Sequence, residues 1–184
     1  RDGESFGIRG INSTGVTGYQ KDNLASILVD GVFQTDLALE AGSFHLWDLE
    51  SIEVLRGAQS TNQGINSLAG TILLEHRPGD PEGRTGAGRL GISTLRNREA
   101  AVVANEAVGG ALGLRLNYSK EVNDGYLSNT ATANDDWGGW NRDRARISLV
   151  HRSGARDEIA LDTKFHRNRQ GGTYVQSADP FRYE

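Results

Sequence analysis

The 184-residue chain has no cysteine, no methionine, only three prolines and no long apolar run. Without cysteine the chain cannot form a disulfide framework. Its mean hydropathy is −0.51, and no segment approaches the roughly 18 consecutive apolar residues that a transmembrane helix needs. A membrane β-barrel stays possible, because its strands alternate polar and apolar residues and therefore have a low average hydropathy.

The beginning of the chain also lacks two features of a complete protein. Position 1 is Arg1 rather than methionine, and no basic stretch is followed by an apolar leader of the signal-peptide kind. We therefore expect a processed or truncated chain. The net charge is −4 and the basic residues are scattered, which predicts no nucleic-acid partner.

A break in composition divides the chain into two regions. Residues 77–84 (RPGDPEGR) contain two prolines and two glycines, which interrupt regular structure. In residues 1–80, apolar bursts at 26–29, 49–55 and 68–74 predict short strands, and Asp30-Gly31 predicts a tight turn after the first. One helical turn is expected at residues 48–51, so this region is predicted to be a small α+β unit.

Residues 86–184 show a period-two alternation that predicts about five antiparallel strands. The clearest strand, 111–120, has Leu112, Leu114, Leu116 and Tyr118 on one face and Gly113, Arg115, Asn117 and Ser119 on the other. The other expected strands are 88–94, 99–108, 144–152 and 158–167. Each has about the 9–11 residues with which a tilted strand crosses a bilayer.

Two interpretations of this alternation remain open on the pattern alone. A soluble antiparallel sheet with one face packed on a core shows the same pattern. The Arg, Lys, Asp and His residues of the polar face favour a water-filled lumen. Tight connections at 108–111 and 153–156 alternate with a long polar one at 122–141, as expected for short periplasmic turns and a long external loop.

Four segments of the first region resemble, in order and spacing, the plug of TonB-dependent outer-membrane receptors. They are residues 6–11 (FGIRGI), 28–32 (LVDGV), 49–57 (LESIEVLRG) and 59–72, with Gln59-Ser60-Thr61, Gly64, Asn66-Ser67-Leu68-Ala69-Gly70 and Ile72. The resemblance is close over residues 5–78. From there to about residue 170, only the pattern of strands is similar. It departs from the family at Gln59, where proline is common, and at Asn62-Gln63.

The resemblance implies a plug domain at 1–80, without its TonB box, followed by the first strands of an incomplete transmembrane β-barrel at 86–184. It implies active uptake of a scarce nutrient such as a ferric siderophore, with no catalytic residues and no cofactor. The location would be the bacterial outer membrane, with the plug in the barrel lumen facing the periplasm. The partners would be TonB of the TonB-ExbB-ExbD complex, the nutrient and outer-membrane lipid.

The resemblance also suggests roles for individual residues. Plug loops at 13–20, 33–44 and 61–64 would contact the ligand through Tyr19, Phe33, Phe44, His45 and Gln63. Arg9, Glu53 and Arg56 would form ion pairs that lock the plug to the barrel wall. We further expect close backbone approach to require five glycines, which are Gly10, Gly31, Gly57, Gly64 and Gly70.

Other site types are less well supported by the residues. The four histidines lack zinc-site spacing, and residues 134–139 lack the ligand pattern of a calcium loop. Adjacent Asp135 and Asp136 point apart on an extended chain, so they make a poor catalytic pair. Two alternatives to transport remain: a soluble, exported β-rich module that binds carbohydrate or peptide, and a β-sheet hydrolase that uses loop carboxylates.

Overall fold

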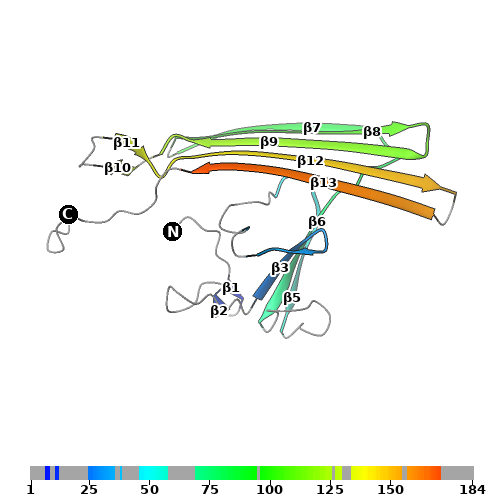
Figure 1. Ribbon diagram of the computed structural model, residues 1–184, viewed down its shortest axis with the longest axis horizontal. Coiled ribbons are helices and arrows are strands. Elements are labelled where there is room, and N and C mark those ends of the chain that lie inside the picture. The colour runs from blue at the N-terminus through cyan, green and yellow to red at the C-terminus, as the bar shows by residue number, and fades with distance from the viewer. Residues whose placement is uncertain are drawn as a thin grey trace.

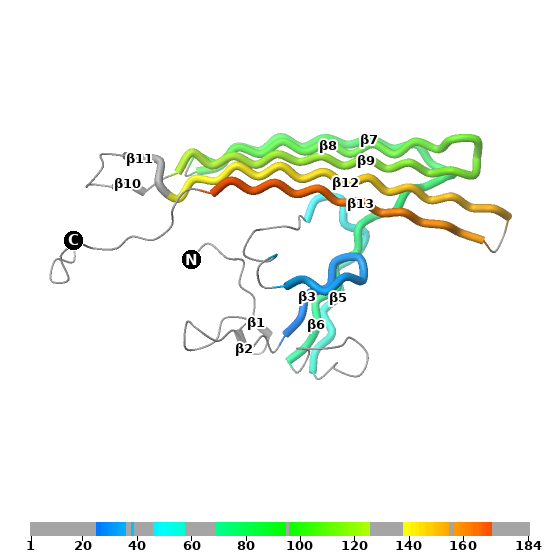
Figure 2. Tube along the Cα trace, in the orientation of Figure 1, coloured from blue at the N-terminus to red at the C-terminus, as the bar shows by residue number. Residues whose placement is uncertain are grey.

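The computed structural model describes residues 7–8, 11–12, 25–35, 38, 46–57, 69–94, 96–125, 127–129, 134–154 and 157–170. Two larger sheets dominate these ranges, and Figures 1 and 2 show the long five-stranded sheet lying over a smaller four-stranded one. Helical backbone is described only at Ala38. Within the described ranges, no helix has the length and apolar character needed to span a membrane.

The four-stranded sheet has the order β4-β3-β6-β5. Its strands are β3 (Ala25–Val29), β4 (Val32–Phe33), β5 (Leu49–Arg56) and β6 (Gly70–His76). β3 and β6 are parallel, whereas the other two pairs are antiparallel. Ile27, Val29 and Leu74 are buried together, with Leu49 and Ile72 packed against them. This small apolar cluster is the core of the sheet.

The turn predicted at Asp30-Gly31 is confirmed. Asp30 and Gly31 have φ values of 50° and 75°, and Val29 pairs with Val32 across them, as in the two-residue hairpin turns that match strand twist. A Cβ on Gly31 or Gly57 would meet nothing within 4 Å. The expected reason for these two glycines, close backbone approach, is therefore wrong, because their positive φ is what favours glycine. Gly10 and Gly64 lie outside the described residues.

The helical turn expected at residues 48–51 is also wrong. Asp48 adopts a left-handed conformation with φ 68°, and Leu49 already opens β5. The carbonyl of Asp48 accepts a hydrogen bond from the Arg77 amide at 3.2 Å, which continues the pairing of β5 with β6. A neighbouring strand therefore satisfies the backbone that a single helical turn would have left mostly unpaired.

The five-stranded sheet is a simple antiparallel meander with the order β13-β12-β9-β8-β7. Its strands are β7 (Thr85–Ser93), β8 (Asn97–Val108), β9 (Leu112–Asn123), β12 (Trp140–Ser153) and β13 (Asp157–Gln170). Four of them have 12 or 14 residues and so exceed the expected length. The sequence pattern predicted shorter strands because the residues at the polar strand ends do not alternate with apolar residues.

Two short hairpins complete the described structure. β10 (Leu127–Asn129) pairs with β11 (Asn134–Trp137) inside the long connection between β9 and β12. β1 (Gly7–Ile8) pairs with β2 (Ile11–Asn12) near the beginning of the chain. In Figure 1 the β10–β11 hairpin lies at one end of the long sheet, and the tight turns after β8 and β12 lie at the other end. We call these the loop end and the turn end.

The strand register divides the long sheet into two faces of opposite character. Arg115 pairs with Ser148 across β9 and β12, and these alternate with pairs such as Leu116 and Ile147. Arg115 and Ser148 face the small sheet and are buried, while Leu116 and Ile147 are exposed on the opposite face. The alternation predicted for these strands is confirmed. The face that is buried, however, is the polar one.

Candidate functional site

The two sheets meet along a polar interface, and its most enclosed contact joins Asp48 to Arg115. The Arg115 guanidinium donates to both carboxylate oxygens of Asp48, through Nε at 2.8 Å and through Nη2. The side chains are only 4% and 8% exposed. Asp48 lies just before β5, and Arg115 lies in the first half of β9. A bidentate pair with this burial fixes the orientation of one sheet on the other.

A second contact between the sheets is centred on Asp30, in the β3–β4 turn. Its Oδ1 accepts the His76 backbone amide at 2.7 Å, and its Oδ2 accepts His76 Nδ1 at 2.8 Å and the Lys164 ammonium of β13. Burial by itself raises the pKa of Asp30. The hydrogen bonds from His76 and Lys164 outweigh burial and hold that pKa well below its ordinary value of 3.8. Asp30 is therefore an ionised anchor between a turn and the long sheet.

Arg146 of β12 links the β12–β13 pair to the segment that follows the small sheet. Its Nε and Nη2 bind the two carboxylate oxygens of Asp162 at 2.6 and 2.8 Å. Its Nη1 donates to the Arg77 carbonyl at 2.8 Å, immediately after β6. Asp162 neutralises the buried guanidinium through Nε and Nη2, which leaves Nη1 to bind the connecting segment.

Residues 77–84, which connect the two sheets, are fastened across the inward face. The Asn105 side chain accepts from the Asp80 amide at 2.9 Å and donates to the Asp80 and Gly83 carbonyls at 2.9 and 2.7 Å. Ser148 Oγ accepts from the Gly79 amide at 3.2 Å. A Cβ on Gly113 would lie 2.5 Å from the Asp80 carbonyl carbon. The segment that the sequence marks as irregular is thus held by β8, β9 and β12.

Further along the inward face, towards the loop end, β12 carries two more buried arginines. Arg142 and Arg144 lie 3.8 and 3.6 Å from Oε2 of Glu121 on β9. The Arg142 guanidinium also stacks over Trp140, 5.1 Å from the ring centroid. Three arginines thus occupy successive inward positions of one strand. A soluble sheet packed on an apolar core has no comparable face.

A cavity of about 280 Å³ lies between the two sheets. The small-sheet side contributes Val29, Gln34, Trp47 and His76, and the long sheet contributes polar and cationic side chains from β9, β12 and β13. The latter include Asn117, Ser119, Arg144, Arg146, Lys164 and His166. The cavity approaches the lower end of the volume range of small-molecule sites. Most of its lining surface is apolar, although several of the lining side chains carry polar or charged groups.

The opposite face of the long sheet is apolar and uncovered by any described residue. Leu90 and Ile92 are 88% and 90% exposed, and other large apolar side chains on this face are at least 43% exposed. They are Val102, Val108, Leu116, Tyr118, Ile147, Ile159, Leu161 and Phe165. A face of this size does not stay exposed to water in a soluble protein. The sheet is therefore inverted, with its arginines inside and its aliphatic residues outside.

The described residues include only some of the predicted site residues. Phe33 lies in β4, half-buried, opposite Leu28. Glu53 and Arg56 are exposed on β5, and no ion pair among the described residues includes either of them. Tyr19, Phe44, His45, Gln63 and Arg9 lie outside the described residues. The ligand-contact and ion-pair roles of all eight therefore stay predictions.

The interface uses residues to which the sequence assigned no role as ion pairs. Arg115, Arg146 and Lys164 were recognised only as members of polar strand faces, and Asp30 only as a turn residue. The available signal was the position of a basic residue in the middle of an otherwise apolar alternating strand. Its acidic partner could not be found in this way, because Asp48 and Asp30 lie 67 and 134 positions away from the cations they bind.

Comparison with known families and structures agrees with this arrangement. Residues 1–71 match the family described as TonB-dependent Receptor Plug Domain. The match ends within β6, so it covers most of the four-stranded sheet and none of the long one.

Solved structures extend the similarity into the long sheet. The ferric yersiniabactin uptake receptor FyuA from Yersinia pestis aligns with 79% of this chain at 23% identity and a TM-score of 0.66. The pyoverdine outer membrane receptor FpvA from Pseudomonas aeruginosa aligns with 78% at 16% identity and 0.63, and the copper transporter OprC with 80% at 16% and 0.66. The alignments span only 20–23% of the length of these three proteins.

Proposed function

We propose that this chain, whose residues 1–71 match the plug domain family of TonB-dependent receptors, forms the plug and first wall strands of a nutrient-uptake receptor of the outer membrane. Residues 1–80 would be the plug, and residues 86–184 would hold about the first five strands of the transmembrane barrel. The role is transport, in which the protein moves a cargo and makes or breaks no covalent bond.

The observation that carries the proposal is the inverted long sheet. Its apolar face suits lipid, since no aqueous environment would leave so many large aliphatic side chains exposed. Its arginine-rich face suits a polar lumen filled by a plug domain. The same sheet in a soluble binding module or a hydrolase would require a partner layer over the apolar face. The described residues contain none.

The interface suggests how the plug is held and released. A buried ion pair such as Asp48–Arg115 adds little net stability but costs roughly 3–5 kcal/mol when one partner alone is removed. Such contacts keep the plug in a single position at rest. When the plug is pulled, water can solvate the two charged groups of each ion pair as the interface opens, so the ion pairs would break one after another.

The finer assignments follow from the family. We propose that TonB of the TonB-ExbB-ExbD complex pulls the plug from the periplasmic side, and that the β10–β11 hairpin belongs to an external loop. The turn end of the sheet would then face the periplasm. The relatives named above take up ferric yersiniabactin, pyoverdine or copper, so a metal or metal chelate is the class of cargo we propose. The cavity between the sheets would lie on its path.

Uptake by cells tests the proposal directly. The gene containing this chain would be deleted in its source bacterium and restored on a plasmid, and uptake of radiolabelled iron or copper, free and as siderophore chelates, would be measured. We expect one cargo to require both the restored gene and an intact TonB. A matched strain without TonB is the control for energised transport.

Two results would contradict the proposal. Uptake of every cargo that persists unchanged in the deletion strain would remove the transport role. A gene product recovered in the soluble periplasmic fraction, rather than in outer membranes, would favour the soluble binding module instead.

A further inference from the structure

The cavity between the two sheets combines a mainly apolar lining with basic side chains. Val29 and Trp47 supply apolar groups, and the stems of arginine and lysine side chains are apolar too. Arg144, Arg146 and Lys164 supply positive charge, and none of the described lining residues is an aspartate or a glutamate. A lining of this kind favours a ligand that joins an apolar body to one anionic group.

The basic side chains of the cavity lie in two neighbouring rows of the long sheet, and the first row is already occupied. In this row Arg146 lies between Asn117 and Lys164. Two hydrogen bonds join Arg146 to Asp162. The Lys164 ammonium is bound to Asp30. Because both cations have carboxylate partners, this row forms a fixed wall of the cavity and is not the place for a further anion.

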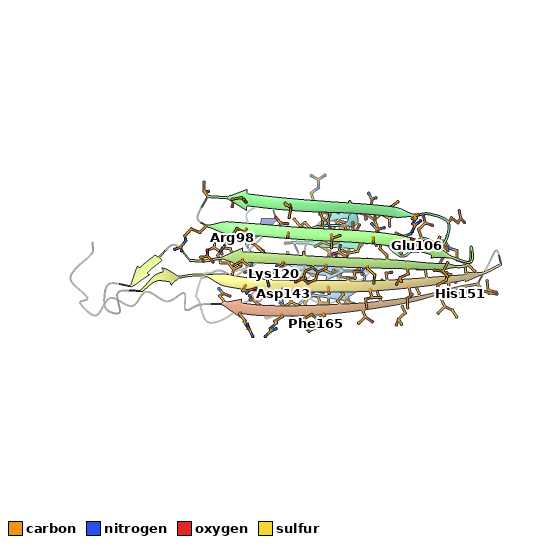
Figure 3. The ribbon with its side chains drawn as sticks, turned by 90° about the horizontal axis from the view of Figure 1, so that it is seen from above. Arg98, Glu106, Lys120, Asp143, His151 and Phe165 are labelled. Carbon is orange, nitrogen blue, oxygen red and sulfur yellow. The ribbon has the colours of Figure 1, made fainter. Side chains whose placement is uncertain are left out.

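The second row, one step towards the loop end, contains Ser119, Arg144 and His166, which all line the cavity. Lys120 and Asp143, the chain neighbours of Ser119 and Arg144, mark this position along the sheet in Figure 3. Ser119 is only 1% exposed, and its hydroxyl has no hydrogen-bond partner among the described residues. A buried hydroxyl without a partner costs free energy, which a hydrogen-bond acceptor placed in the cavity would restore. The row therefore offers a hydroxyl donor beside a guanidinium.

The volume of the cavity limits the apolar body of the ligand. An apolar cavity of roughly 150 Å³ holds one benzene molecule. The cavity between the sheets, at about 280 Å³, therefore has room for an aromatic group of two fused rings. The Trp47 indole and the His76 imidazole belong to its lining, and flat side chains pack well against aromatic rings.

We propose that the cavity binds a small aromatic carboxylate, with its carboxylate on Ser119 and Arg144 and its rings against Val29 and Trp47. Guanidinium and hydroxyl donors both bind carboxylate oxygens. One such molecule would contact both sheets at once. It is therefore distinct from the transported cargo, because a ligand that bridges the sheets opposes the separation that release of the plug requires. Binding depends on the contact between the two sheets and goes beyond the proposed transport role.

Calorimetric titration of the complete receptor in phosphatidylcholine nanodiscs tests the inference. The probe is 2-naphthoate, and the heat measured with empty nanodiscs is subtracted. Arg144→Gln should weaken binding at least about tenfold, because it removes a charged hydrogen-bond donor, and Ser119→Ala should weaken it about threefold. The control is Arg142→Gln, at the next inward position of β12. Arg142 is as buried as Arg144 and also lies near Glu121, but it does not line the cavity, so its substitution should leave the affinity nearly unchanged.

Two further ligands separate the alternatives. The neutral isostere 2-naphthamide should bind at least about tenfold more weakly than 2-naphthoate, and millimolar acetate, which has no ring, should not displace the probe. Equal binding of the amide, or displacement by acetate, would overturn the inference, because the cavity would then recognise only the rings or only the charge.

The variants decide where the probe binds. Ser119→Ala removes one oxygen atom that bonds to no described residue, so it tests the site even if Arg144→Gln does not fold. Equal affinity of the wild type and Ser119→Ala would overturn the inference, because the probe would then bind elsewhere. The titration uses neither cargo nor TonB, so its failure leaves the transport proposal intact, and failed uptake leaves probe binding intact.

Discussion

At the scale of single residues, the interface between the small sheet and the long sheet depends on a few buried polar groups whose partners lie far away in the sequence. Asp48 with Arg115, Asp30 with Lys164, and Asn105 with the connecting segment are the main examples. Each satisfies a group that would be costly to bury alone. Removing both partners should therefore cost less than the sum of the costs of removing each one alone.

The Asp48–Arg115 pair gives a direct test of that statement. We expect Asp48→Ala and Arg115→Ala each to lower the free energy of unfolding of the complete receptor by about 3–5 kcal/mol, because each leaves a buried charge unpaired. The double variant should lose less than the sum of the two. Guanidinium unfolding in detergent measures all three. The exposed pair Arg84–Glu106 is the matched control, with less than about 1 kcal/mol expected, and additive losses at Asp48 and Arg115 would contradict the prediction.

Asp30 predicts a pH dependence. Its pKa is lowered in the folded protein, since the hydrogen bonds from His76 and Lys164 outweigh burial. Its contribution to stability is therefore complete above the ordinary aspartate pKa of 3.8 and is lost as the pH falls below that value. Asp30→Asn should flatten the decrease in melting temperature between pH 4 and pH 2, relative to the wild type. Glu50→Gln, at an exposed carboxylate of β5, should leave the decrease unchanged; an equally steep decrease in Asp30→Asn would be the contrary result.

Gly113 is needed for space rather than for its φ angle. An added Cβ would overlap the backbone of Asp80 and Pro81, at 2.5–2.7 Å. We expect Gly113→Ala to lower stability by about 1–3 kcal/mol and to make residues 77–84 more accessible to protease. Gly88→Ala on β7, whose Cβ would meet only one atom at 3.7 Å, is the control. Equal protease sensitivity of both variants would argue against a backbone clash at Gly113.

At the scale of elements, the long strands combine two different environments on one backbone. Each strand of the long sheet has a polar inward set and an apolar outward set, and the register aligns these sets from strand to strand. The middle rows of the outward face contain Val102, Ala104, Leu116 and Ile147. Charge appears only towards the ends. The position of a residue along the strand therefore determines how well a charge is tolerated there.

That gradient can be measured with two arginine substitutions. Leu116→Arg, in the middle of the outward face, should lower the stability of the receptor in vesicles by about 2–4 kcal/mol. Ile92→Arg, in the same row as Arg98 near the loop end, should cost about 1 kcal/mol or less. The folded fraction after urea titration reports both. If the two substitutions cost the same, the outward face would not contact a bilayer.

At the scale of the whole molecule, the long sheet is open. β7 and β13 are edge strands, and the apolar face has no covering layer among the described residues. Edge strands and exposed apolar faces both promote association between chains. The 184-residue chain by itself should therefore aggregate in buffer without detergent. Size-exclusion chromatography with light scattering checks this. A monodisperse monomer with a cooperative melting transition would contradict the membrane assignment.

The sequence by itself determined the elements that local chemistry controls. The alternation of strands such as 111–120 assigned each side chain to a face, because successive side chains of a strand point to opposite sides. Asp30-Gly31 specified its turn, since aspartate and glycine are among the few residues that tolerate a positive φ. The four segments in order and spacing predicted a plug domain, and residues 1–71 match that family. The lengths expected for four strands of the long sheet were too short, and the helical turn expected at 48–51 was wrong. In both cases pairing with a neighbouring strand outweighs the local preference of the sequence.

Only the tertiary structure decided which face of the long sheet is buried and which charges meet. The alternation alone is the same for a soluble sheet and for a membrane wall, because it records two faces without saying what covers each. Burial of Arg115 and Arg146 beside exposed Leu116 and Ile147 favours the membrane wall that we propose. The partners of the buried cations depend on how the small sheet docks. Contacts across 67 or 134 positions leave no periodic signal in the sequence.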